Sequence, residues 1–383
     1  MRILLVGEYS RLHNSLKEGL LQHGHEVVLI GTGDGFKNFP SDISIKLSIF
    51  SNSFFKPIAK VFDELFNIQL IELEYYYKLK KVIENLKGFD VVQLINEQSL
   101  KTSPKHEIKL ISQLIKQNKK VFLLSCGTDY TSVKYALDKK SRYSILSPYF
   151  DDVLLKNQYR FILKYVSAPY KKLHEFLYLN VQGVIASDID YHIPLNGNRK
   201  YLGLIPNPIN TDIIQSNPLN ISDKIVIFHG INRMNYIKKG NRFFDEALKI
   251  IKEKYKNRVE IITSENLPYD TYIKTFENCH ILLDQVYAYD QGYNALEAMA
   301  KGKVVFTGAE QEWLDYYNLE EDTVAINALP DVPYLVSKLE WLIINPDKLV
   351  EISKNARAFI EKEHHYIKVA NTYVKHWQNH IIT

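Results

Sequence analysis

The sequence predicts an α/β protein with two βαβ domains. At 383 residues the chain is too long for one compact core and fits two domains of ordinary size. Short apolar runs alternate with helix-length amphipathic segments along its whole length, as they do in parallel sheets covered by helices. A turn-rich segment, residues 205–212, lies between two such series.

Composition limits the class of protein. The chain is 46% hydrophobic and 24% charged, which is typical of a globular protein. Its two cysteines, Cys126 and Cys279, exclude a disulfide framework and give no metal-ligand spacing, so we expect a reducing compartment. No apolar run approaches the ~18–20 residues that span a bilayer. Residues 1–7 are too short an apolar run for a signal peptide, so we expect a cytoplasmic protein.

Charge is unevenly distributed between the two halves of the chain. Residues 1–200 hold 28 Lys and Arg against 20 Asp and Glu, which leaves 20 against 24 for residues 201–383. A basic first half suits peripheral contact with an anionic membrane, or with a phosphorylated lipid, although scattered solvated lysines would give the same count. No nucleic-acid-binding motif accompanies the basic residues, so no nucleic acid is expected as a partner.

The N-terminal series begins with a strand over residues 1–7, a helix over 12–21 and a strand over 26–30. No G-x-G-x-x-G follows the first strand, and the glycines of residues 31–35 come after the second, which disfavours a dinucleotide site. Further strands are expected at 91–95, 120–125 and 183–187, and a helix at 108–117. Residues 54–86 read as a pair of helices.

Polar side chains follow several of these strands. The carboxyl ends of parallel strands meet at the crevice of an open α/β sheet, so these side chains are candidates for lining a cleft. Asp129 either faces the cleft or caps the helix after it. The candidates are Glu8, Ser10, His13, Asn14, Glu97 and Asp129.

The most informative stretch is residues 281–308. It reads as a strand over 281–283, a loop with Gly292, a helix over 295–300 and a strand over 304–306. A helix that starts after a glycine loop directs unpaired N–H groups and its positive dipole end at the cleft, where phosphate binds readily. Glu297, about one turn into the helix, could accept hydrogen bonds from vicinal hydroxyls. An ordinary βαβ unit with a surface glutamate is the alternative.

The run Gly292-Tyr293-Asn294-Ala295-Leu296-Glu297-Ala298-Met299-Ala300, with Lys301-Gly302, resembles the donor-site signature of retaining nucleotide-sugar glycosyltransferases (group 1, family 4-like) with the GT-B fold. Gly24-His25-Glu26-Val27 and residues 205–212 are similar to other segments of that family. The resemblance implies two Rossmann-like βαβ domains that face each other across a cleft. They would be an acceptor-binding domain over 1–206, with the polar residues after its strands on the acceptor side of the cleft, and a donor-binding domain over 207–365. A final helix, 366–383, would cross back to the first domain.

The resemblance also implies site residues. Glu297 would hold the nucleotide ribose, while Arg233 and Lys239, with Lys238 beside it, would clamp the donor diphosphate. Gly292, Tyr293 and Asn294 would form the helix end of the donor site. The family often has a further glutamate eight residues before Glu297, where this chain has Tyr289. Asp290, a candidate catalytic residue, or Asp284 could substitute for it.

A D-x-D tripeptide, Asp188-Ile189-Asp190, binds metal in a different glycosyltransferase fold, but a match of three residues is weak. We therefore expect no metal and no cofactor, with a UDP- or GDP-sugar as co-substrate. The function implied is sugar transfer to a glycan or lipid-linked acceptor, for capsule or lipopolysaccharide synthesis at the inner face of the membrane. A sugar-nucleotide epimerase of the same fold and a catalytically silent nucleotide-sugar-binding protein are the alternatives.

Overall fold

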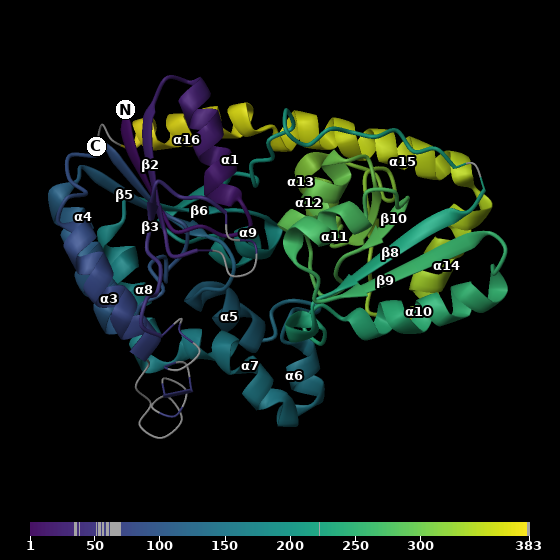
Figure 1. The fold of residues 1–383 in the computed structure, drawn as a ribbon, viewed down its shortest axis with the longest axis horizontal. Helices are drawn as coiled ribbons and strands as arrows, with labels where there is room; N and C mark the ends of the chain where they lie inside the picture. The colour runs from purple at the N-terminus through teal and green to yellow at the C-terminus, as the bar shows by residue number, and fades with distance from the viewer. Residues whose placement is uncertain are drawn as a thin grey trace.

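The computed structural model describes residues 1–33, 37, 39–50, 52, 55, 57, 58, 61, 70–221 and 223–380. In this part of the chain, two parallel β-sheets form two α/β domains that lie side by side (Figure 1). Both sheets consist of short apolar strands that are buried between helices, as expected for all-parallel sheets.

The first sheet has the strand order β3-β2-β1-β4-β5-β6-β7, and every described pair is parallel. Its centre is β1 beside β4, where Leu4 lies opposite Val92. The strands are β1 (Arg2–Val6), β2 (Glu26–Gly31), β3 (Ile43–Ser44), β4 (Val91–Leu94), β5 (Lys120–Ser125), β6 (Gly183–Ala186) and β7 (Tyr201–Leu204).

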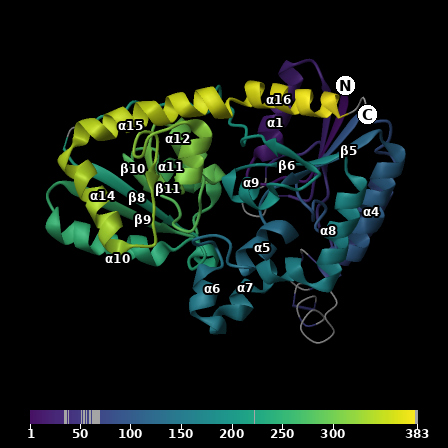
Figure 2. The ribbon, with the colours of Figure 1, turned by 180° about the vertical axis from the view of Figure 1, so that it is seen from behind.

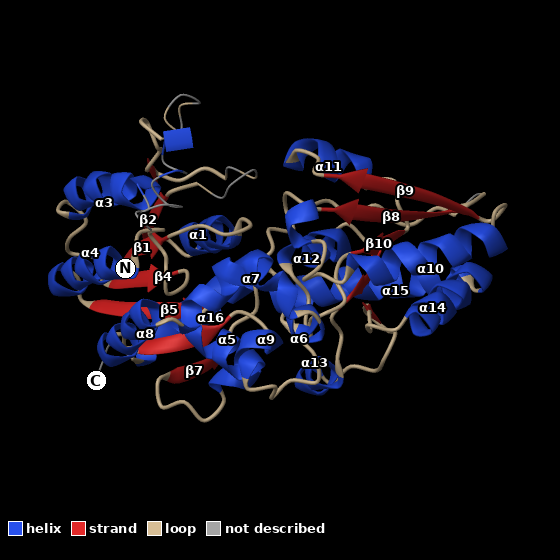
Figure 3. Ribbon diagram, turned by 90° about the horizontal axis from the view of Figure 1, so that it is seen from below, coloured by secondary structure: helices blue, strands red, loops and turns tan. Residues whose placement is uncertain are grey.

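Helices cover both faces of this sheet. Figures 1 and 3 show α3, α4 and α8 on one face and α1 on the other. Helix α4 begins at Pro104, four residues before the predicted start, because proline suits the first turn of a helix. The helices of this domain are α1 (Leu12–Gln22), α3 (Leu70–Ile83), α4 (Pro104–Gln117), α5 (Tyr130–Leu137), α6 (Ser147–Asp151), α7 (Lys156–Leu163), α8 (Ala168–Asn180) and α9 (Ile189–Leu195).

The second sheet has the order β12-β11-β10-β8-β9 and is also parallel. Its side chains alternate between two cores: Ile281 and Leu283 of β10 pack with the α10 and α14 side, and Leu282 packs with the α12 side. The elements are β8 (Ile225–Ile231), α10 (Asn241–Lys254), β9 (Val259–Glu265), α11 (Tyr269–Thr275), β10 (Ile281–Leu283), α12 (Tyr293–Ala300), β11 (Val304–Thr307), α13 (Gln311–Tyr317), β12 (Ile326–Asn327) and α14 (Val332–Ile344).

The C-terminal helices join the two domains. Helix α15 (Pro346–Phe359) continues through a π-helical turn (Ile360–His364) into α16 (Tyr366–Asn379), and Figure 2 shows this pair running along one edge of both domains. Helix α16 packs on α1, where a Cβ on Gly19 would lie 2.4 Å from the carbonyl oxygen of Tyr366. The indole of Trp377 donates to Gln93 Oε1 of β4 at 3.1 Å. This contact ties the end of the chain to the first sheet.

Some elements differ from expectation. Sequence patterns do not indicate β7 or α9, because β7 is half-buried and contains Gly203, while α9 contains Pro194. Much of the predicted helix pair over 54–86 lies outside the described residues, and its second member is α3. Among the described residues, no helix is long and apolar enough to cross a membrane.

Candidate functional site

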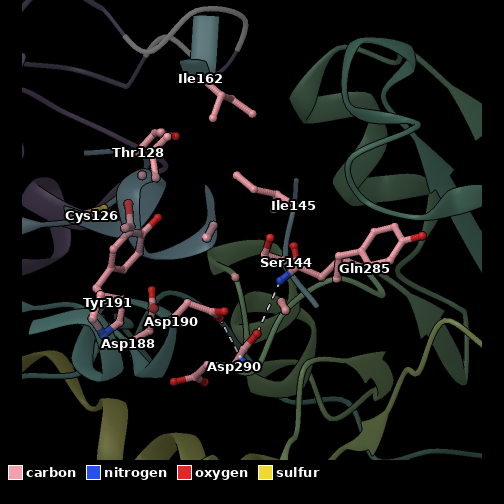
Figure 4. A pocket seen from close by; sticks show the side chains of 18 of the residues that line it. Cys126, Thr128, Ser144, Ile145, Ile162, Asp188, Asp190, Tyr191, Gln285 and Asp290 are labelled. Carbon is pink, nitrogen blue, oxygen red and sulfur yellow. Dashed lines mark hydrogen bonds between the residues drawn. The ribbon is translucent and has the colours of Figure 1, made fainter. Parts of the chain in front are cut away.

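A cavity of about 370 Å³ lies between the two domains. Figure 4 shows Thr128, Asp188 and Tyr191 on the side of the first domain and Gln285 with Ser144 on the opposite side. Asp290 lies at the lower edge of this view. Many of the lining residues from the first domain follow β1, β5 and β6, as expected for a crevice at the carboxyl ends of parallel strands, and others come from residues 141–146 and from α7.

Lys239, Asp284 and Asn294 form one cluster in the second domain. Asp284 follows directly after β10, and its Oδ1 accepts hydrogen bonds from Lys239 Nζ and from Asn294 Nδ2, both at 2.9 Å. Asp284 is buried, whereas the Lys239 side chain is 30% exposed. The buried carboxylate therefore holds the lysine next to the first turn of α12, with part of the ammonium open to solvent.

Arg233 and Lys238 are arranged differently. Arg233 lies in the 3₁₀ turn after β8, is half-exposed, and forms an ion pair with Glu265 in which Nε donates to Oε2 at 2.8 Å. The Lys238 ammonium lies 4.4 Å from the ring centroid of Phe161, in α7 of the first domain. Burial lowers the pKa of Lys238 to about 8. Lys238 thus contacts the opposite domain, and Arg233 is paired on the surface.

Glu297 is buried in the second turn of α12, with 3% of its surface exposed. Its Oε1 accepts a hydrogen bond of 2.7 Å from the hydroxyl of Tyr269, and its Oε2 has no hydrogen-bond partner. Burial raises the pKa of Glu297, and the positive charges of Lys37, Arg11 and Lys301 oppose that rise. A buried carboxylate oxygen without a donor is an acceptor ready for a ligand hydroxyl.

The first turn of α12 contacts the other domain. Gly292 is the N-cap, and a Cβ there would lie 3.9 Å from Asp284 Oδ2. The hydroxyl of Tyr293 donates to the carbonyl oxygen of Pro208 and accepts from Ser15 Oγ of α1, both at 2.8 Å. Tyr293 therefore turns its hydroxyl toward the interface between the domains, although its side chain also lines the cavity.

Asp188, Asp190 and Asp290 form an acidic cluster at this interface, in which Asp290 is buried and the other two are half-buried. Asp190 accepts the backbone N–H of Tyr289 and of Asp290, each at 3.1 Å, and Asp290 Oδ2 accepts the N–H of Ile189 at 2.9 Å. Burial raises the pKa of Asp190 to about 7 and that of Asp290 to about 6. Burial also raises the pKa of Asp188, and the charges of its two neighbours add to the effect.

Three acceptor-side candidates, Glu8, His13 and Asn14, hold the loop after β1. The Oε2 atom of Glu8 accepts from the backbone N–H and the side-chain amide of Asn14, at 2.8 and 2.6 Å. The Nδ1–H of His13 donates to the carbonyl of Gly7 at 2.7 Å, and burial lowers the pKa of His13 to about 4. Ser10 Oγ accepts a hydrogen bond from Lys37 Nζ at 3.3 Å, and Ser10 is the member of this group that lines the cavity.

Glu97 and Asp129 both have partners within the first domain. Glu97 pairs with His174 Nδ1 at 2.6 Å, and burial raises its pKa. Asp129 caps α5: its Oδ1 accepts the N–H of Ser132 at 2.7 Å. Of the two roles predicted for Asp129, the structure shows the helix cap.

Sequence reasoning missed a group of residues that joins the domains. Arg142 forms ion pairs of 2.7 Å with Glu310 and Glu312, and its guanidinium lies 4.8 Å from the ring centroid of Tyr289. Tyr143 donates to Glu310 as well. These partners lie 147–170 residues apart in the sequence, so no local pattern indicates them. Tyr289 occupies the position of the family's additional glutamate, and its hydroxyl accepts from the backbone N–H of Arg142.

The described residues contain no group of three or more His, Cys, Asp and Glu that could hold a metal ion. In Asp188-Ile189-Asp190, the Asp190 carboxylate accepts backbone N–H groups of the opposite domain.

Comparison with known proteins relates this site to a family. Residues 237–375 match the family model described as glycosyl transferase-like. This segment contains Lys238, Lys239, Asp284, Asp290 and all of α12. The chain has the GT-B fold, as the solved structures compared below show. The expected resemblance to group 1 glycosyltransferases with that fold is confirmed.

Solved structures show the same fold across the GT-B chain. Sucrose-phosphate synthase from Thermosynechococcus elongatus superposes with a TM-score of 0.62 and 14% identity, over 99% of this chain and 98% of that chain. Anabaena HepE in complex with UDP and glucose gives a TM-score of 0.60 and 13% identity, over 99% and 100%. TarM gives 0.59 and 10% identity, over 98% of both chains. No curated protein matches the sequence.

Proposed function

We propose that this GT-B protein is a glycosyltransferase that moves a sugar from a UDP- or GDP-sugar to a glycan or lipid-linked acceptor. The observation that carries the proposal is Glu297, a buried carboxylate on the cleft-side helix of the second domain, with one oxygen free of any partner. A ribose offers two neighbouring hydroxyl donors, which match the two oxygens of one carboxylate. Glu297 is therefore assigned to the ribose.

The diphosphate is assigned to Lys239 and the first turn of α12. Sugar transfer breaks the bond between the anomeric carbon and the diphosphate oxygen, so negative charge grows on the leaving group. Lys239 is held beside Asn294 by Asp284 and can stabilise that charge together with the N–H groups at Gly292 and Tyr293. Positive charge from side chains and a helix end suffices, so the proposed mechanism uses no metal.

The sugar and the acceptor are assigned to the cavity. An acceptor hydroxyl oxygen bonds the anomeric carbon, and its proton passes to the departing diphosphate oxygen, the base left nearest the reacting carbon. Asp290 lines this cavity, but both of its carboxylate oxygens accept backbone N–H groups, from Gln291 and Ile189. Its role in this proposal is to shape the closed site. Retention of configuration is carried over from the family that the sequence resembles.

Arg233 and Lys238 are further candidates for binding the diphosphate, but each must first move. Arg233 must leave Glu265, and Lys238 must leave Phe161, before either can reach a ligand. Similar structures support a nucleotide sugar: HepE was solved with UDP-glucose, and MnaA from S. aureus was solved with UDP. The acceptor is proposed to be a saccharide of capsule or lipopolysaccharide synthesis, presented at an anionic membrane to the basic first half of the chain.

Nucleotide release with and without an acceptor tests the proposal. The purified protein is incubated with UDP- and GDP-sugars, and release of UDP or GDP is followed before and after adding candidate acceptors. A glycosyltransferase releases nucleotide much faster with an acceptor. Saturable binding without turnover would indicate a silent binding protein, and conversion of the sugar nucleotide without any acceptor would indicate an epimerase.

A further inference from the structure

Tyr269 lies where a ribose would lie on Glu297. It opens α11, directly after the loop that follows β9, and its hydroxyl donates to Glu297 Oε1 at 2.7 Å. Burial raises the pKa of Tyr269, and the negative charge of Glu297 raises it further, so the phenol stays protonated and remains a donor. The tyrosine thus supplies one hydroxyl to a carboxylate that has room for two.

Residues of the first domain contact the ring of this tyrosine. The ring of Phe39 meets the Tyr269 ring edge-on, with centroids 5.4 Å apart, and the ammonium of Lys37 lies 4.9 Å from the Tyr269 ring centroid. Lys37 also donates to Ser10 Oγ at 3.3 Å. Contacts from both domains therefore hold the Tyr269 ring over Glu297. Glu297 does not line the 370 Å³ cavity, although Gly292 and Tyr293, a few residues before it, do.

The arrangement leaves Glu297 half satisfied. One oxygen has the tyrosine hydroxyl, and the other is buried without a donor, which is unfavourable for a carboxylate. A vicinal diol would serve both oxygens, so replacing one hydroxyl with two favours the exchange. The base of a nucleoside is attached to the same ribose. It would therefore lie next to the ring of Tyr269 once the tyrosine hydroxyl has moved away from Glu297.

We propose that Tyr269 occupies the ribose position of the empty donor site, that a nucleoside displaces its hydroxyl from Glu297, and that its ring then stacks on the base. The inference rests on the proposed function, because it takes Glu297 as the ribose ligand. It assigns the nucleoside part of the donor to a residue that no family motif marks. Stacking on an aromatic ring tolerates any base, so Tyr269 should serve uracil and guanine alike.

The test compares Tyr269→Phe with Tyr269→Ala in the full-length protein, by calorimetric titration with UDP, GDP, uridine and inorganic pyrophosphate. Phe removes the competing hydroxyl and keeps the ring, so UDP and uridine should bind about fivefold tighter, the scale of one hydrogen bond. Ala also removes the stacking ring, so it should bind UDP more weakly than Phe does. Pyrophosphate, which has no ribose, should bind all three proteins equally.

The outcomes separate this inference from the proposed function. Unchanged UDP affinity in Tyr269→Phe, in a protein whose wild type binds UDP and whose thermal midpoint is normal, would overturn the displacement. Equal UDP affinity in the Phe and Ala variants would overturn the stacking. An equal gain for pyrophosphate would mean that the ring merely blocks the cleft, which also contradicts the inference. A wild type that binds neither UDP nor GDP would instead overturn the proposed function itself.

Discussion

Asp190 and Asp290 bind each other's backbone segments across the two domains. The Asp190 carboxylate accepts the N–H of Asp290 at 3.1 Å, and the Asp290 carboxylate accepts the N–H of Ile189, the residue before Asp190, at 2.9 Å. Each domain thus contributes one carboxylate and one N–H to the same buried contact. This exchange holds the start of α9 and the loop between β10 and α12 together beside the cavity, and it predicts that closure of the cleft depends on pH.

Lowering the pH from about 7 to about 5 should favour the closed form. Burial raises the pKa of Asp190 to about 7 and that of Asp290 to about 6, whereas in a wet, open cleft both would titrate near the ordinary value of about 4. The closed form then binds more protons than the open form between pH 4 and 7. The equilibrium constant for closure therefore falls as pH rises through that range, by at most about tenfold per pH unit for each proton, and it is constant above pH 7.

The radius of gyration from X-ray scattering at pH 5.5, 6.5 and 7.5 measures this dependence. Asp188 faces the same contact and its pKa is also raised by burial, while the charge of Glu310 helps to raise the pKa of Asp190 and the backbone N–H of Tyr289 opposes that rise. Asp190→Asn should flatten the pH profile. A radius of gyration that shrinks as pH rises would be the opposite of the expected change, and it would contradict the proposal that the Asp190–Asp290 contact makes closure depend on pH.

Glu297→Ala should weaken UDP or GDP binding by roughly 10- to 100-fold, because it removes hydrogen bonds to a charged acceptor. Glu297→Gln keeps the shape, loses one acceptor oxygen, and should lie in between. Glu351→Ala, which removes an exposed carboxylate paired with Lys348, is the matched control and should bind like the wild type. Calorimetric titration gives the three affinities, and an unchanged value for Glu297→Ala would remove Glu297 from the ribose site.

Lys239→Ala should lower kcat by roughly 10²- to 10³-fold, the typical loss for one group that stabilises developing charge. Lys238→Ala should cost less, because its ammonium lies against Phe161. Since Lys239→Ala also leaves the buried Asp284 without its cation, Lys239→Arg serves as a second variant that keeps the charge. Steady-state rates decide: equal losses for Lys238→Ala and Lys239→Ala would contradict the assignment of the diphosphate to Lys239.

Arg142→Ala should open the cleft with little loss of stability. The Arg142 side chain is 52% exposed, and its ion pair with the half-exposed Glu312 is of the surface kind that contributes about 0–1 kcal/mol. Glu310 is buried, but it keeps hydrogen bonds from Tyr143 and Asn327 when the arginine is removed. Both partners of Arg142 belong to the other domain, so the loss should appear as a larger radius of gyration and a higher KM for the donor sugar. Arg2→Ala, which breaks an ion pair within the first domain, is the control. If Arg142→Ala has the wild-type radius of gyration but a lower melting temperature, Arg142 stabilises the fold and does not control closure of the cleft.

Much of the fold follows from local patterns in the sequence. The apolar run of β10, the strong helix formers of α12 and the glycine before that helix predict the unit that presents Glu297, and all three lie where expected. Strands such as β5 are correct to the residue because a fully buried strand of a parallel sheet is one continuous apolar run. Half-buried β7 and proline-containing α9 carry weaker patterns and were not predicted.

The contacts of the site were harder to predict. That Asp284 holds Lys239 depends on β8 and β10 lying side by side in the second sheet. That Tyr293 turns its hydroxyl to Ser15 and that Arg142 reaches Glu310 depends on which surfaces of the two domains meet. Neither spacing nor propensity encodes these contacts, because each partner lies 45–278 residues from the other. The resemblance indicates positions that carry chemistry in a family, and the motifs that carry it do not include Tyr269.

The most direct test of the whole account is a crystal structure of the protein with UDP or GDP bound. We predict the pyrophosphate at the first turn of α12 within hydrogen-bond distance of Lys239 Nζ, and the ribose hydroxyls on both oxygens of Glu297. A nucleotide bound at any other place, or a Lys239 ammonium and a Glu297 carboxylate that do not touch it, would contradict the account.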